Sequence, residues 1–122
     1  MLKTASGDHN FSVEVATTNQ ERSLGLMFRR ALPENSGMLF LYDQAQPASM
    51  WMKNTIIPLD MIFIAEGGKV HRIVPFTEPF STEAIFSEGD VVAVLELNAG
   101  QAERIGLKLG DQVLYPGLAK SE

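Results

Sequence analysis

Alternation of apolar and polar residues predicts that much of this chain forms β-strands. FSVEVAT (11–17) alternates apolar with polar residues, which is typical of a strand with one covered face. GMLFLY (37–42) is apolar on both faces and predicts a covered strand, and VVAVLEL (91–97) is the strongest strand signal in the chain. Further strands are predicted at 50–53, 59–65, 69–75 and 84–86, and on both sides of a turn at residues 110–111.

The first of two predicted helices follows the strand at 11–17. TNQE is a capping-box sequence, in which Thr18 accepts from the amide of Glu21 while the Glu21 side chain reaches back. The helix is expected near 19–28 and must end before Pro33, because the residue before a proline is biased away from helical backbone.

The second predicted helix lies in NAGQAERIG (98–106), with Asn98 as its N-cap and Gly106 at the position of a C-terminal glycine. Between the strands, DQAQPAS (43–49) is predicted as a loop and EGG (66–68) as a hairpin turn, where glycine supplies a positive φ.

These elements predict a mainly β fold, an antiparallel sandwich like a jelly roll or a small barrel, with two short helices. The strands at 50–53 and 59–65 are expected to pair. The pattern IGLKLGDQV leaves a small barrel of the double-psi kind as a second interpretation. A length of 122 residues fits one domain, predicted at 11–115 between a flexible N-terminus (1–10) and a C-terminal tail (116–122).

Composition excludes several classes of function. The chain has no cysteine, so disulfides, thiolate metal sites and cysteine nucleophiles are excluded. A net charge of −5 argues against a protein that holds nucleic acid through its phosphates. No segment is long and apolar enough to span a membrane, and the N-terminus lacks the apolar region of a signal peptide.

Three blocks in order resemble one known family. GLMFRRALPENSGMLFLYD, SMWMKNTIIPLDMIFIAEGGKV and VLELNAGQAERIGLKLGDQV are similar to the bacterial and archaeal domain-of-unknown-function family 192. The resemblance covers residues 11–115 and implies a mainly β single domain reminiscent of a jelly roll, often exported behind a leader. It implies no activity. Many members carry a cysteine pair after the strand that reads KVHRIV here, but this chain reads EPFSTEAIF there.

The segment MWMKNTIIPLD (50–60) places a lysine and an aspartate in the most apolar part of the chain. If the flanking strands pair, Lys53 faces Asp60, and each charge makes the other tolerable away from water. One interpretation is a structural ion pair. The other is a pocket for a small polar ligand, a sugar or a peptide, with Trp51 as a platform and Lys53, Asn54 and Asp60 as polar contacts.

Two further charged residues are candidates for the site. Arg29, at the end of the first helix, either suits the helix dipole or binds a ligand anion or an acidic cluster. Glu96 is the one acid in VVAVLELNAG. It is either an exposed acid at a strand end, a buried acid with a partner, or one half of a carboxylate pair with Asp60, as glycosidases use.

Three hypotheses of function remain. The first is a small binding module, the second an enzyme in which Asp60 and Glu96 serve as acid and base, and the third a structural domain that acts through an oligomer surface. His9 and His71 have no second ligand at metal-binding spacing, so no metal or cofactor is expected. Without a cysteine, a histidine pair or a nucleophile elbow, the sequence favours binding over catalysis. It leaves the ligand and the oligomeric state open.

Overall fold

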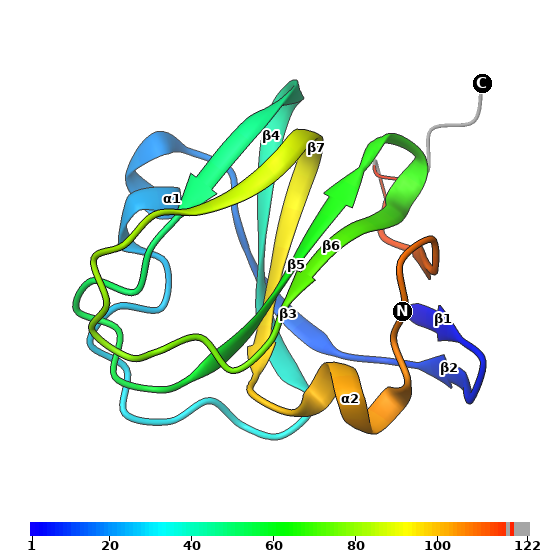
Figure 1. Cartoon of the computed structure of the whole chain (residues 1–122), viewed down its shortest axis with the longest axis horizontal. Helices are drawn as coiled ribbons and strands as arrows, with labels where there is room; N and C mark the ends of the chain where they lie inside the picture. Colours follow the sequence, from blue (N-terminus) through cyan, green and yellow to red (C-terminus); the bar gives the residue numbers. More distant parts are fainter. Residues whose placement is uncertain (117, 119–122) are drawn as a thin grey trace.

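One curled eight-stranded sheet forms most of the protein, as the computed structural model shows (Figure 1). The structure describes residues 1–116 and 118, so most of the predicted tail at 116–122 lies outside it. The strands are β1 (Leu2–Thr4), β2 (Gly7–His9), β3 (Ser12–Ala16), β4 (Ser36–Met50), β5 (Leu59–Ala65), β6 (Lys69–Val74), β7 (Ile85–Asn98) and β8 (Gln112–Val113). The helices are α1 (Asn19–Leu24), the 3-10 turn η1 (Glu66–Gly68) and α2 (Gln101–Ile105). The predicted mainly β class with two short helices is confirmed.

The strand order, β2-β1-β8-β6-β5-β7-β4-β3, explains the curl of the sheet. Its two edge strands, β2 and β3, are consecutive in the sequence and only residues 10–11 separate them. Two residues span at most about 11 Å between the flanking Cα atoms, so the two edges start close together at one end of the sheet. Among the strands of the described residues, β3 and β4 pair in parallel, and the other pairs are antiparallel.

The central strands β5 and β7 bury both of their faces. Ile62 and Ile64 point into a cluster with α2, which we call the α2 face, while Met61 and Phe63 point to the opposite face. Because both faces are covered, LDMIFIA shows no polar alternation apart from Asp60. Each side of the sheet thus has its own apolar core.

Both predicted helices form, and both are shorter than expected. The capping box of α1 is present, with the Glu21 amide donating to Thr18 Oγ1 at 3.0 Å. The helix ends at Leu24 because Gly25 turns at φ 49°. The N-cap of α2 is Gly100 and not Asn98, whose side-chain amide donates to the Leu32 carbonyl instead. The C-cap at Gly106 is as predicted.

The expected pairing of 50–53 with 59–65 is wrong. Residues 43–49, predicted as a loop, belong to β4, which runs on to Met50 and pairs with the equally long β7. Irregular pairing around residues 41–49 accommodates the polar residues and Pro47, so these mark bulges within a strand and not its end. The chain then turns through residues 52–55, where the Met52 amide donates to the Ser81 carbonyl.

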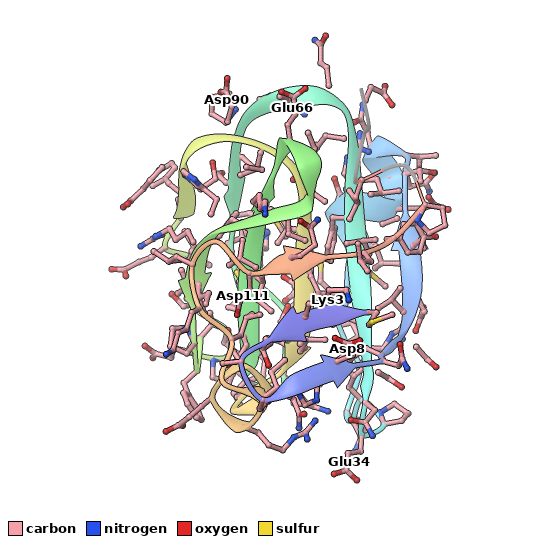
Figure 2. All side chains as sticks on the ribbon, turned by 90° about the vertical axis from the view of Figure 1, so that its right-hand side faces the viewer. Lys3, Asp8, Glu34, Glu66, Asp90 and Asp111 are labelled. Carbon is pink, nitrogen blue, oxygen red and sulfur yellow. The ribbon has the colours of Figure 1, made fainter. Side chains whose placement is uncertain are left out.

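The N-terminus also differs from expectation. Residues 1–10, expected to be flexible, contain the hairpin β1–β2, because Leu2 is buried in the α2 face and β1 pairs with β8. Figure 2 shows this hairpin with Lys3 beside Asp8, whose charged atoms are 3.6 Å apart. Of the two strands predicted around residues 110–111, the second forms as β8, but residues 107–109 form no strand, so that prediction is wrong. Among the described residues, no helix is long and apolar enough to cross a membrane.

Candidate functional site

A pocket of about 320 Å³ opens between α1, the second half of β4 and the turn at 51–55. Figure 1 shows α1 beside the far end of β4. The polar residues that line the pocket are Asn19, Arg22, Ser23, Tyr42, Ser49, Thr55 and Glu96, and Phe40, Leu26 and Trp51 are among the apolar ones. The pocket therefore combines hydrogen-bonding groups with an apolar wall, as ligand sites do.

Glu96 lies at the buried side of this pocket. Its neighbours across the sheet are Met38 on β4 and Met61 on β5, both buried. The residue is only 4 % exposed, and this burial raises the pKa of its carboxyl to about 8. Glu96 is thus a mostly protonated, neutral acid at pH 7, and the exposed strand-end acid that the sequence allowed is wrong.

The carboxyl of Glu96 has no hydrogen-bond or ion-pair partner among the described residues. Every fully enclosed side-chain nitrogen or oxygen in this part of the chain has a partner. The small part of Glu96 that remains accessible must therefore include its carboxyl oxygens, and these open into the pocket. A neutral carboxyl so placed offers one donor and acceptor sites to whatever enters.

Arg22 and Tyr42 form one wall. The guanidinium of Arg22 lies 5.2 Å from the centre of the Tyr42 ring and donates from Nη1 to the carbonyls of Thr17 and Leu41, each at 2.6 Å. Its Nη2 donates to Asn19 at 2.7 Å. Burial raises the pKa of the Tyr42 hydroxyl, although the charge of Arg22 opposes this. Arg22 therefore ties α1 to β4 and holds the wall in place.

Trp51 lines this pocket and also a neighbouring hollow, which Lys53 and Asn54 line with it. The Lys53 ammonium is 5.1 Å from the Trp51 ring, a cation–π contact, and Trp51 is 46 % exposed. Asn54 has a left-handed backbone (φ 57°), which asparagine tolerates better than most residues, and its carbonyl accepts from the Phe28 amide.

Asp60 does not pair with Lys53, so that expectation is wrong. Asp60 is fully buried and accepts three backbone amides, from Phe76 at 3.0 Å, Gly100 at 3.1 Å and Ala102 at 2.9 Å. The last two lie at the start of α2, where a carboxylate is stabilised. Lys53 is exposed and lies over the Trp51 ring. Backbone amides, and not a lysine, make an aspartate tolerable within the apolar strand β5.

The proposed pair of Asp60 and Glu96 does not form either. Leu97 faces Asp60 in the register and belongs to the α2 face, while Met61 faces Glu96 and belongs to the opposite face. Because side chains alternate along a strand, the two carboxyl groups point to opposite faces of the sheet. They cannot act together on one ligand.

Arg29 is also outside the pocket. It forms an ion pair with Glu14 on β3, in which Nη2 donates to Oε1 at 2.7 Å and Nη1 contacts Oε2. The hydrogen bond from Arg29 lowers the pKa of the Glu14 carboxyl. Both side chains are substantially exposed, 37 % and 54 %. Arg29 thus joins the turns that follow α1 to the edge strand β3.

Tyr42, Arg22, Asn19 and Thr55 are pocket residues that sequence reasoning did not identify. Asn19 and Arg22 are three apart on a helix, which signals a shared face, but nothing in the sequence shows that this face packs on β4. In the described part of the chain, no cluster of three metal-ligating side chains is present.

Comparison with known proteins shows which family this chain belongs to. The chain matches the family DUF192, described as an uncharacterized ACR, over residues 1–115. It belongs to this family. No curated protein matches it significantly.

Two solved structures share the DUF192 fold at high sequence identity. A protein from Sinorhizobium meliloti 1021, provisionally described as a transcription regulator, is 46% identical with a TM-score of 0.88, over 91% of this chain and 87% of that one. A protein of unknown function from Novosphingobium aromaticivorans DSM 12444 is 40% identical with a TM-score of 0.91, over 93% and 81% of the two chains. The likeness extends over most of this chain.

Proposed function

We propose that this domain is a small binding module whose pocket recognises a small polar ligand through the carboxyl of Glu96. The observation that carries the proposal is an unpartnered carboxyl, 4 % exposed, that lines a pocket of about 320 Å³. Burial of an acid without a partner lowers the stability of the fold. Such a residue is readily explained if a ligand supplies the missing partner, because functional sites often reduce stability.

The neighbours of Glu96 support recognition more than catalysis. Thr55, Ser49 and Asn19 offer hydroxyl and amide groups in the same pocket, and Trp51 offers an aromatic wall. An enzyme that used Asp60 with Glu96 is not supported, because the two side chains lie on opposite faces of the sheet. The acid and base that such a reaction needs would have to come from other groups.

A role in transcription, as described for the Sinorhizobium meliloti protein, is not what we propose for this chain. A net charge of −5 opposes binding to DNA phosphates. The pocket, at about 320 Å³, is also too small to hold a DNA duplex. The size of the pocket suits a small ligand and not nucleic acid.

The test compares wild-type protein with Glu96→Leu in a thermal-shift screen of small sugars, dipeptides and simple amides. A compound at about 100 times its Kd stabilises its target by about 2.7 kcal/mol. We expect at least one compound to stabilise the wild-type protein and to leave Glu96→Leu unchanged. The leucine variant itself should unfold at a higher temperature at pH 7, because an unpartnered polar group is replaced by an apolar one in an apolar environment.

Glu34→Gln is the matched control, because Glu34 is exposed and projects from one end of the molecule (Figure 2). It should bind like the wild-type protein. A compound that stabilises the wild-type protein and Glu96→Leu equally would contradict the proposal, as would a screen in which nothing binds.

A further inference from the structure

Trp51 borders three adjacent hollows and not one. Beside the Glu96 pocket, a hollow of about 520 Å³ lies over α1 and the turn, lined by Gln20, Ser23, Leu24, Met27, Lys53 and Asn54 with Trp51. A third, of about 270 Å³, is lined by Trp51 with Ser49, Met50 and Ala84.

The three hollows are parts of one groove. Ser23, Leu24 and Met27 line both the first and the second, and Ser49 and Met50 line both the first and the third. Trp51 is shared by all three, so a ligand that contacts its ring can extend into the hollow on either side. We call this surface the Trp51 groove. It fits a chain of several similar units better than one small molecule.

The groove's polar groups are mostly uncharged. Amides and hydroxyls come from Asn19, Gln20, Ser23, Ser49, Asn54 and Thr55. Of the two cations, Arg22 already donates to two backbone carbonyls and to Asn19, and Lys53 lies over Trp51. Glu96 is a mostly protonated, neutral acid at pH 7, so it adds no positive charge that would attract an anionic ligand. These contacts favour a neutral ligand rich in hydroxyl groups.

We propose that the Trp51 groove binds a neutral oligosaccharide that lies across Trp51 with one sugar unit directed at Glu96. A sugar ring has an apolar face of C–H groups and an edge of hydroxyls. The face suits an aromatic ring, and the edge suits amides, hydroxyls and a carboxyl. This inference rests on the proposed function, since it names the class of ligand for the same pocket.

The chain offers a direct probe, because Trp51 is its single tryptophan. Its fluorescence is recorded while the wild-type protein is titrated with the mono-, di- and tetrasaccharides of four neutral series: β-1,4-glucan, α-1,4-glucan, β-1,4-xylan and chitin. We expect one series to give a saturable change, with the tetrasaccharide bound at least about tenfold more tightly than the monosaccharide, which is about 1.4 kcal/mol. The gain reflects contacts in the hollows on both sides of Trp51.

Calorimetry with the best tetrasaccharide then compares two variants. Trp51→Ala should weaken binding at least about tenfold, because it removes the aromatic ring that borders all three hollows. Leu109→Ala, which truncates an exposed apolar residue outside the groove, should leave binding unchanged. Both substitutions are at exposed positions, so both variants should fold, and circular dichroism checks this.

Three results would overturn the inference. The first is that no series gives a saturable change at millimolar concentration. The second is that a neutral tetrapeptide, Gly-Ser-Gly-Ser, binds more tightly than every saccharide. The third is that affinity does not depend on the length of the saccharide or on Trp51. In each of these cases a small compound that stabilises the wild-type protein but not Glu96→Leu would still support the proposed function, so the two failures are distinguishable.

Discussion

Asp60 and Glu96 lie on paired strands one position out of register, and their carboxyl groups point to opposite faces of the sheet. One carboxyl accepts three backbone amides, and the other has no partner among the described residues. Two acids on neighbouring strands thus have different roles: Asp60 stabilises the fold, while Glu96 lowers its stability and opens into a pocket. The predictions below separate these roles.

The first prediction concerns pH and Glu96. Its carboxyl ionises near 4.5 in the unfolded chain and near 8 in the folded protein. The stability that this group contributes is therefore fully present below about pH 4.5 and is lost as the pH rises to about 8. Each pKa unit corresponds to about 1.4 kcal/mol, so the loss is at most about 5 kcal/mol. The glutamine in Glu96→Gln cannot ionise, so this variant should not lose stability in this way as the pH rises.

Urea unfolding of the two proteins at about pH 4, 6 and 8 measures this difference. The free energy of unfolding of Glu96→Gln, relative to the wild-type protein, should rise steadily across the series. Other titrating groups are common to both proteins and cancel. A difference that stays constant with pH would mean that Glu96 ionises normally in the folded protein.

The second prediction concerns Asp60. Asp60→Ala leaves three amides without their acceptor, and each unsatisfied buried donor costs about 1–3 kcal/mol. We expect a loss of at least about 3 kcal/mol in the free energy of unfolding, and a smaller loss for Asp60→Asn, which keeps one acceptor oxygen. Lys53→Met, at an exposed position, should change stability by less than about 0.5 kcal/mol.

The double variant Lys53→Met/Asp60→Asn decides whether the two residues interact. Because the structure gives Asp60 other partners, the effects of the single substitutions should add to within about 0.5 kcal/mol. A larger coupling energy would restore the ion pair that the sequence suggested.

The third prediction concerns Arg29 and Glu14. Their ion pair is substantially exposed, and such pairs contribute about 0–1 kcal/mol. A double-mutant cycle with Arg29→Ala and Glu14→Ala should give a coupling energy in that range, and smaller in high salt. Arg29→Ala should also bind any pocket ligand like the wild-type protein. A tenfold loss of affinity would instead assign Arg29 to the site.

The fourth prediction concerns the cap of α1. Thr18→Ala removes the acceptor for the Glu21 amide, which should lower the free energy of unfolding by about 1 kcal/mol. Because α1 supplies Asn19 and Arg22 to the pocket wall, ligand affinity should fall as well. Thr18→Ser keeps the acceptor and should restore both. Hydrogen exchange of the α1 amides measures the loss of local order, and unchanged exchange would show that the cap does not hold this helix.

Local patterns in the sequence determined the class of the fold. Alternation identified β3, and runs of apolar residues identified β5 and the second half of β7. The capping box identified α1 and the glycine at 106 the end of α2, because these features depend on neighbours within a few positions. The same patterns misplaced the end of β4, since a strand with bulges and a loop share polar residues and proline.

The partners of the polar residues were decided by tertiary structure alone. From the sequence, Lys53 and Asp60 looked like a pair because they are seven residues apart around a predicted turn. In the fold, β5 pairs with β6 and β7, so Asp60 meets the start of α2, forty residues on, and Lys53 meets Trp51. The sequence by itself showed that Lys53, Asp60 and Glu96 are charged residues within apolar segments. Which face each side chain takes depends on strand register, and register is set by contacts between distant segments.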